Sequence, residues 1–342
     1  MDSDISTTTW ADLPADLVSA IAGRLPAAAD LARFRSVCPS WRSASAAHAA
    51  RRRVPLLLLP SGEGRDRATP RVWSLAGGRF REPGVPVPPG RGVSHLYASH
   101  HGWALAVADG DLSATLVHPF AAGATADLPP LSAASFRDES WTPIGCSAAA
   151  RVTGVTYCGG AFYLLEGSTC KVTAVDAETL AAAAVIEPPP AVVPGPRCLV
   201  NLAVSPPGEL LLLVRKLLLE SGFNAWQVKV FRANRAAGDR SPGWSWSEVA
   251  GGVGDRAVFV DHLRAFCVEA SALNGLRGNC VYDARSCEEL HDDYGMDVTV
   301  EHTVDVLDIA DVTTLDVSLR KLVSLCPNRF WQWPSWSLPN LH

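Results

Sequence analysis

Short apolar runs bounded by glycine, proline and other turn residues recur along most of the chain, and this recurrence limits the possible folds more than any other feature. Three runs begin at Gly102, Gly160 and Gly208, a spacing of roughly 50 residues that is associated with propeller blades. Asp109-Gly110, a strong hairpin turn, separates the first of these runs from a further run at 111–117. The remaining strand-like runs are 54–59, 71–75, 111–117, 170–175, 226–231, 257–260, 265–268 and 279–282. The pattern predicts an all-β, propeller-like domain over residues 54–336.

The run Leu210–Leu219 is long enough to be read as a helix. Pro206-Pro207-Gly208 before it and Ser221-Gly222 after it are turn signals that favour strands instead. Arg215 and Lys216 interrupt the run, which is also far below the roughly 20 apolar residues of a membrane helix. We therefore expect a strand pair here and no membrane span.

Residues 10–50 follow a helical period instead. Apolar residues recur every four positions at Leu13, Leu17, Ile21 and Leu25. Asp12 is placed to cap this first helix, Pro14 lies near its first turn and Pro26 ends it.

Two further helices are expected before residue 50. Asp30 can cap the second, in which Leu31, Phe34 and Val37 mark one face and Arg33 and Arg35 the other. Cys38-Pro39 begins the third, because proline suits the first helical position, and this helix runs past Trp41 to about His48. Three short helices cannot bury so much apolar surface among themselves. Part of it should therefore contact a partner, either another protein or the downstream domain.

Charge and cysteine usage exclude several classes of protein. The net charge is −5, whereas proteins that bind nucleic acid or anionic membranes usually carry a basic surplus. The nine cysteines are scattered without a CxxC pair, as expected for reduced thiols in the cytoplasm or nucleus. The acidic start, Met1-Asp2-Ser3-Asp4, does not fit a signal peptide.

No motif predicts a catalytic, cofactor or metal site. Gly252-Val253-Gly254 imitates part of a dinucleotide loop, but a strand-like run follows it where a phosphate-binding helix would be needed. Cys280, Cys287 and His291 do not have the spacing of a common zinc site. We therefore expect a protein without catalytic residues, cofactor or metal.

The N-terminal helical segment resembles the F-box of plant proteins. The matching residues are Leu13-Pro14-Ala15-Asp16-Leu17, Ile21, Arg24-Leu25-Pro26, Asp30-Leu31, Arg33-Phe34-Arg35, Val37-Cys38 and Trp41-Arg42. The resemblance implies that residues 10–50 bind a Skp-type adaptor, and through it a cullin and a RING subunit. The implied adaptor-binding residues are Leu13, Pro14, Leu17, Ile21, Leu25, Leu31, Val37, Cys38, Trp41 and Arg42.

The β segment resembles the plant F-box-associated domain of unknown function, the KIB-like family. The matching motifs include His118-Pro119-Phe120, Leu128-Pro129-Pro130-Leu131 and Gly278-Asn279-Cys280-Val281-Tyr282. The resemblance implies a kelch-like β-propeller that captures a client protein. Asp283–Cys287 depart from the family's more aromatic continuation, so the end of that strand is left open.

Together these features predict an α+β multidomain chain. It comprises a disordered N-terminus (1–9), a three-helix F-box (10–50), a β-propeller-like client-binding domain (54–336) and a tail (337–342). The predicted function is substrate recognition for an SCF-type (Skp–cullin–F-box) ubiquitin ligase, with an unknown client. A propeller scaffold that is not coupled to a ligase is the first alternative. An enzyme or lectin is the second, and it would require convergent carboxylates or a sugar-stacking aromatic side chain.

Overall fold

The protein is described from a computed structural model. The described residues are 10–25, 28–51, 55–59, 71–75, 79–81, 93–98, 103–108, 113–117, 125–128, 151–220, 223–235, 243–262, 264–271, 273, 276–290, 298–310, 314–315, 322–325 and 335–337. The expected disordered N-terminus, residues 1–9, and the hairpin turns Asp109-Gly110 and Ser221-Gly222 lie outside them. Ser337, which we expected to begin the tail, is the last residue of a strand.

The helical segment contains one more helix than the sequence predicts. After a 3₁₀ turn at Trp10–Asp12 come α1 (Ala15–Arg24), α2 (Ala28–Arg35), α3 (Pro39–Ala44) and α4 (Ala46–Arg51). The expected third helix is divided at the buried Ser45, whose hydroxyl donates to the Trp41 carbonyl at 2.6 Å. A serine side chain that bonds the preceding turn competes with the helical backbone, so two short helices replace one. None of the described helices is both long and apolar enough to cross a membrane.

Two helix starts differ from the expectation, while a third agrees with it. Pro14, rather than Asp12, occupies the N-cap position of α1. Asp30 lies inside the first turn of α2, where its carboxylate pairs with Arg33 at 3.4 Å. Pro39 begins α3 as expected.

The described strands form five sheets. The first has the order β22 (Ser335–Ser337), β1 (Leu56–Leu59), β2 (Arg71–Ser74) and β3 (Arg79–Arg81). The second contains β4 (Val93–Ala98), β5 (Ala104–Ala108), β6 (Ala114–Val117) and β7 (Thr125–Leu128). The third contains β8 (Val152–Cys158), β9 (Ala161–Glu166), β10 (Val172–Asp176) and β11 (Ala182–Ile186).

The fourth sheet contains β12 (Cys198–Val204), β13 (Leu210–Glu220), β14 (Phe223–Arg235) and β15 (Trp244–Glu248). The fifth has the order β17 (Ala265–Glu269), β16 (Arg256–Val260), β18 (Cys280–Leu290), β19 (Val298–Asp308) and β20 (Thr314–Leu315). β21 (Leu322–Leu325) also pairs with β19. β18 continues to Leu290, which answers the question left open by the unusual residues after Tyr282.

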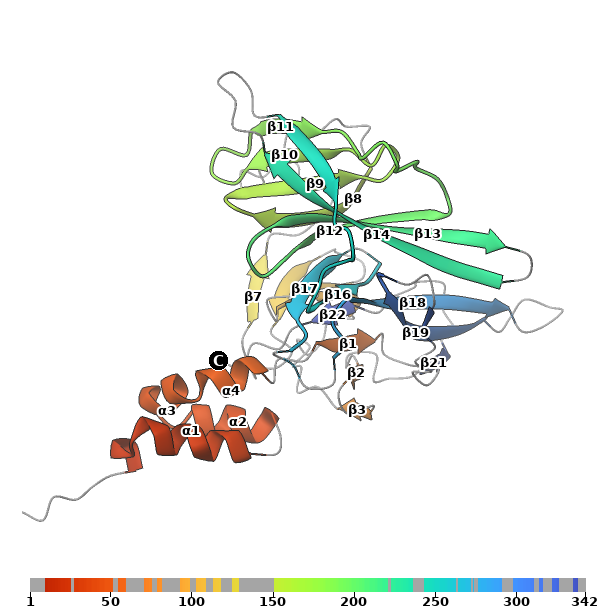
Figure 1. The fold of residues 1–342 in the computed structure, drawn as a ribbon. Helices are drawn as coiled ribbons and strands as arrows, with labels where there is room; N and C mark the ends of the chain where they lie inside the picture. Colours follow the sequence, from red (N-terminus) through yellow and green to blue (C-terminus); the bar gives the residue numbers. More distant parts are fainter. Residues whose placement is uncertain are drawn as a thin grey trace, which may run out of the picture.

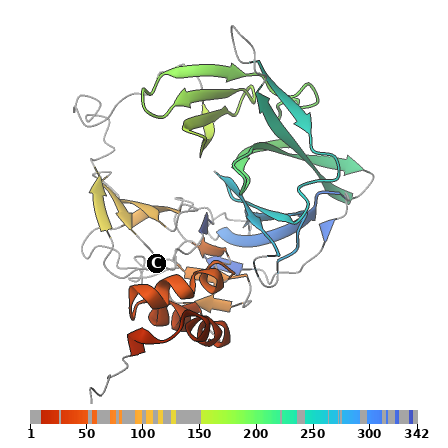
Figure 2. The same cartoon turned by 60° about the vertical axis from the view of Figure 1, so that its left-hand side comes forward.

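The sheets are arranged like the blades of a propeller, and the predicted fold class is confirmed. Figure 2 shows them following one another around a ring, and Figure 1 shows the four helices grouped to one side of it. β12 lies beside β8 and β17 of the neighbouring sheets, and β22 lies beside β4. The 50-residue repeat has a structural meaning, because β5, β9 and β13 are each the second strand of successive four-stranded sheets.

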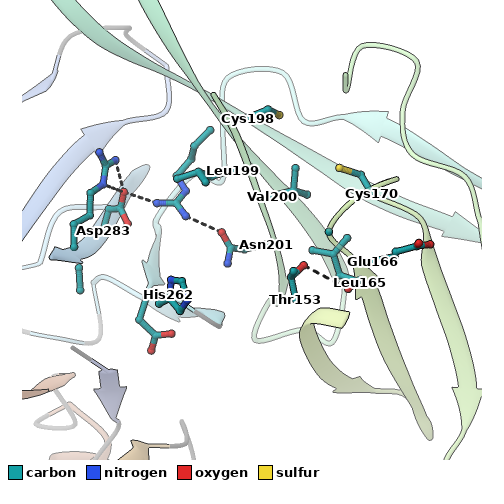
Figure 3. A pocket seen from close by; sticks show the side chains of 15 residues that line it. Thr153, Leu165, Glu166, Cys170, Cys198, Leu199, Val200, Asn201, His262 and Asp283 are labelled. Carbon is teal, nitrogen blue, oxygen red and sulfur yellow. Dashed lines mark hydrogen bonds and ion pairs between the residues drawn. The ribbon is translucent and has the colours of Figure 1, made fainter. Parts of the chain in front are cut away.

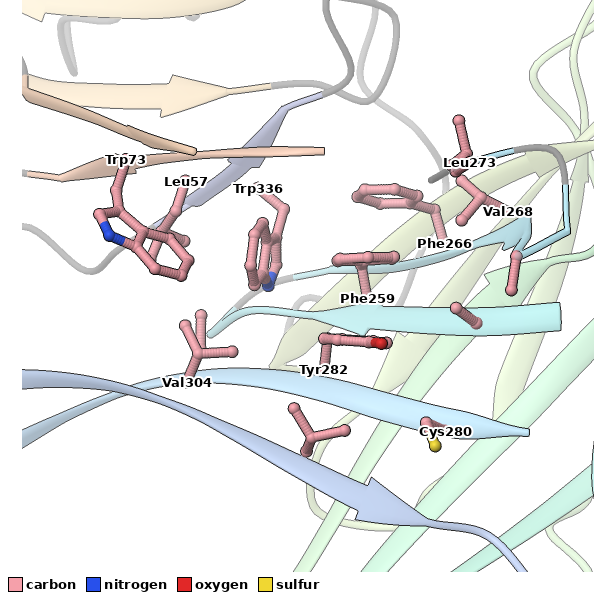
Figure 4. Close-up of a cluster of buried hydrophobic side chains, with 14 residues drawn as sticks. Leu57, Trp73, Phe259, Phe266, Val268, Leu273, Cys280, Tyr282, Val304 and Trp336 are labelled. Carbon is pink, nitrogen blue, oxygen red and sulfur yellow. The ribbon is translucent and has the colours of Figure 1, made fainter. Parts of the chain in front are cut away.

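The two ends of the β domain meet in one sheet. β22, near the C-terminus, pairs antiparallel with β1, and Trp336 lies opposite Leu57. The fully buried Trp336 indole donates its Nε1 proton to the Val260 carbonyl at 2.9 Å. Its ring lies edge-on to Phe259, with the centroids 4.9 Å apart (Figure 4). The C-terminal strand therefore joins the first sheet to the fifth and closes the ring.

β13 explains the long apolar run that the sequence leaves ambiguous. Leu210, Leu212 and Val214 pack in a cluster with the third sheet, whereas Leu211 and Leu213 pack in a cluster with the fifth. A strand that is buried on both faces reads as a continuous apolar run rather than as an alternation. The expected strand is confirmed here.

The glycines that imitate a dinucleotide loop form a tight turn before β16. Gly252 has φ +89°, and a Cβ there would come within 1.9 Å of the Asn279 side-chain oxygen. That oxygen accepts the backbone N–H of Val253 at 2.8 Å. Glycine is therefore required at this position, because a side chain would prevent the close approach of the two chain segments.

Candidate functional site

The four helices bury a small core of their own. Ala22, Leu31 and Ala49 are its buried members, and Leu25 and Phe34 pack against them. Trp41 packs against Phe34, with the ring centroids 4.4 Å apart and the ring planes tilted by 32°. Leu31, one of the residues expected to bind the adaptor, thus lies inside the helical core, where a partner cannot reach it without rearrangement.

A second set of apolar side chains points outward. On α1, Val18 and Ala22 face the core, while Leu17 and Ile21 are 50% and 40% exposed. Val37, in the turn between α2 and α3, is 59% exposed. We call Leu17, Ile21 and Val37 the outer helical face. Since water contact of apolar surface is unfavourable, this face is suited to a protein partner.

The other expected adaptor-binding residues differ in their exposure. Pro14 and Arg42 are exposed, whereas Leu13, Leu25, Cys38 and Trp41 are half-buried. The sequence analysis did not include Trp10, which is 76% exposed and whose backbone carbonyl accepts the Trp41 Nε1 proton at 3.1 Å. The feature of the sequence that could have identified Trp10 is its position three residues before the Leu13-Pro14 pair.

Cys38 is the one thiol in this region with a perturbed acidity. Its Sγ lies 3.0 Å from the Ser40 hydroxyl. This hydrogen bond, together with one to the Trp41 backbone, stabilises the thiolate and lowers the pKa of Cys38. Thiolate is the reactive form of cysteine, so Cys38 is an accessible probe of the helical segment.

The β domain contains a pocket of about 410 Å³ between three sheets (Figure 3). Thr153 and Leu165 line it from the third sheet, and Val200 and Asn201 line it from β12 of the fourth. The connection between β16 and β17 contributes His262. Burial lowers the pKa of His262, which favours the neutral form of its imidazole.

A buried ion network forms one wall of this pocket. Arg215 on β13 pairs with Asp283 on β18, and both side chains are buried. Arg285 also pairs with Asp283, and its guanidinium lies 4.1 Å from the centroid of the Trp226 ring. Arg215 extends from the face of β13 that carries Leu211 and Leu213, which is why it reaches the fifth sheet. The network holds the fourth and fifth sheets together.

Comparisons with known proteins identify both parts of the chain. The F-box domain family matches residues 10–48, and the KIB1-4 beta-propeller family matches residues 132–306. An Arabidopsis thaliana protein named as an F-box protein is 59% identical over 34 residues, which span 10% of this chain and 9% of that protein.

Similarity to solved structures is weak. A chain of a nidogen/laminin complex aligns with 84% of this chain and 99% of its own, at 9% identity and a TM-score of 0.30. Apo AztD from Citrobacter koseri aligns with 83% of this chain and 96% of its own, at 10% identity and a TM-score of 0.21.

The family matches agree with the fold. The F-box match covers the first three helices and the beginning of α4, and the propeller match covers β8 to most of β19. Since the second match extends over just over half of the residues, the chain belongs to the KIB1-4 beta-propeller family, and it is a plant-type F-box protein with an N-terminal F-box and a propeller domain.

Proposed function

We propose that this chain is the substrate-recognition subunit of an SCF-type ubiquitin ligase in the cytoplasm or nucleus. The outer helical face binds a Skp-type adaptor, which connects the chain to the cullin and RING subunits. The β domain binds a client protein. Transfer of ubiquitin is then accelerated by proximity, and no residue of this chain takes part in the chemistry.

The observation that carries this proposal is the outer helical face. Leu17, Ile21 and Val37 are between 40% and 59% exposed, although the same helices bury Leu31 completely. Complete burial of a fully exposed aliphatic side chain contributes about 1.5–3 kcal/mol, and about half of each of these side chains remains to be buried by a partner. The exposed positions are also among those that the F-box resemblance assigns to the adaptor, which supports a dedicated interface over a solvated helical surface.

Co-expression of the full chain with a plant Skp-type adaptor tests the proposal. We expect one complex of equal stoichiometry on size-exclusion chromatography. Val37→Asp places a charge in the interface and should weaken binding by at least about tenfold, because an unpaired buried charge is costly. Leu17→Asp should act in the same way.

Val193→Asp is the matched control, because Val193 is a 74% exposed valine in the β domain. It should leave adaptor binding unchanged. All variants should keep the far-UV circular dichroism of the parent chain. A folded parent chain that elutes without the adaptor would refute the proposal and favour a scaffold that is not coupled to a ligase.

A further inference from the structure

The pocket between the three sheets contains an asparagine side chain whose orientation is determined by its neighbour. Asn201 is only 5% exposed, and its side-chain oxygen accepts a proton from the Arg215 guanidinium at 2.8 Å. A guanidinium can only donate, so the oxygen of Asn201 must face Arg215 and its amide nitrogen must face the other way. Figure 3 shows Asn201 pointing between His262 and Thr153 into the pocket.

The amide nitrogen of Asn201 has no acceptor among the described residues. The nitrogen is not one of the fully buried polar atoms that lack a partner, so it is accessible from the pocket, where an acceptor atom of a ligand can reach it. Thr153 supplies an acceptor beside this donor. Its hydroxyl donates a hydrogen bond to the Leu165 carbonyl at 3.5 Å, and its oxygen lone pairs can still accept a hydrogen bond. The pocket thus presents one donor and one acceptor beside the apolar side chains of Leu165 and Val200.

The charges around the pocket favour an uncharged ligand. The pocket lining carries two guanidinium groups, of Arg215 and Arg285, which both pair with Asp283. It also carries the carboxylates of Glu166 and Asp261, so the positive and negative charges nearly balance. An anionic ligand would be repelled by the carboxylate of Glu166. A cationic ligand would in turn lie near the guanidinium groups of Arg215 and Arg285, so neither sign of ligand charge is favoured. Desolvation of an ionic ligand would therefore lack compensation.

We propose that this pocket binds an uncharged amide, namely a backbone segment of a client peptide with an aliphatic side chain. The peptide carbonyl accepts from Asn201, the peptide N–H donates to Thr153, and the aliphatic group lies against Leu165 and Val200. Only the identification of the peptide as part of a client depends on the proposed ligase function. Adaptor binding and pocket binding are measured separately, so each can fail alone.

Ligand-observed NMR with N-acetyl-leucinamide and the full chain tests this site. The probe has about 12 non-hydrogen atoms, which corresponds to a dissociation constant in the millimolar range. Saturable binding is expected. N-acetyl-leucine, which is an anion, and leucinamide, which is a cation, should each bind at least about tenfold more weakly.

Asn201→Asp keeps the shape and the acceptor that faces Arg215 but removes the donor. It should weaken binding of the neutral probe by about tenfold. Asn234→Asp is the control, because Asn234 is an exposed asparagine on β14 that bonds Ser247 at 2.9 Å outside the pocket. The proposal is wrong if the neutral probe does not bind, if an ionic probe binds equally well, or if Asn201→Asp has no effect.

A longer probe distinguishes a peptide from a small metabolite. N-acetyl-Ala-Leu-Ala-amide should bind more tightly than N-acetyl-leucinamide if the site accepts a continuous backbone. An unchanged or weaker affinity for the longer probe would refute the peptide and assign the pocket to a free small amide.

Discussion

The closing contact of the ring should be the most sensitive position in the β domain. Trp336 is fully buried between the first and fifth sheets, and its indole donates to the Val260 carbonyl at 2.9 Å. Its backbone N–H donates to the Asp261 carboxylate at 3.1 Å, a contact that does not depend on the side chain. Replacement of Trp336 by alanine therefore removes the packing and one hydrogen bond.

The expected loss for Trp336→Ala is large. Truncation of a buried tryptophan costs about 3–5 kcal/mol, and a backbone carbonyl left without its donor adds about 1 kcal/mol. The total of about 5 kcal/mol is comparable with the whole stability of a typical domain. Trp336→Phe retains most of the packing but not the N–H, so it should lose about 1–2 kcal/mol.

Urea unfolding of the full chain, followed by far-UV circular dichroism, measures these losses as shifts of the midpoint. Trp246→Ala is the matched control, because its indole also donates to a backbone carbonyl, that of Glu187, at 2.9 Å. Trp246 is only half-buried, so its replacement should cost no more than about 2 kcal/mol. Equal shifts for Trp336→Ala and Trp246→Ala would refute the idea that ring closure depends on this side chain.

Three further predictions follow from individual residues. Gly252→Ala should destabilise the chain by about 2 kcal/mol, because its φ is positive and the added methyl group has no space, whereas Gly195→Ala should change the urea midpoint little. Arg215→Ala leaves Asp283 buried with fewer partners and should cost about 3 kcal/mol in the same assay; an unchanged midpoint would contradict a structural role for the network. Iodoacetamide should label Cys38 at a lower pH than an ordinary thiol, since a lowered pKa places more thiolate below the usual range, and bound adaptor should slow this labelling; mass spectrometry after short exposure measures both.

Local patterns predicted the type and order of most elements. The glycine-led runs became β5, β9 and β13, and the turn residues around Leu210–Leu219 correctly favoured strands over a helix. These signals work because turn residues and apolar periodicity report the conformation and burial of neighbouring residues along the chain. The division of the third helix at Ser45 was not predicted, because its cause is a hydroxyl bond to the preceding turn that the apolar period does not reveal.

The candidate sites were only partly predictable. The four-residue period grouped Leu17 with Leu13 and Leu25, but Val18 faces the core and Leu17 points outward. A helical period identifies which residues share a face of the helix but not what packs against that face. It therefore could not predict that Leu17 is exposed while Leu31, on the next helix, is buried. The pocket was not predicted, since its walls come from three sheets.

The sequence by itself determined the helical segment, the repeated strands after it and the resemblance to an F-box joined to a propeller. Only the tertiary structure decided that Trp336 closes the ring beside Leu57. It also decided that Arg215 pairs with Asp283 and binds the Asn201 oxygen, so that the Asn201 amide nitrogen faces the pocket. The physical reason is the range of the interactions. Turn chemistry and periodicity act between near neighbours, whereas these contacts join residues far apart in the chain and form only when the sheets pack into a ring.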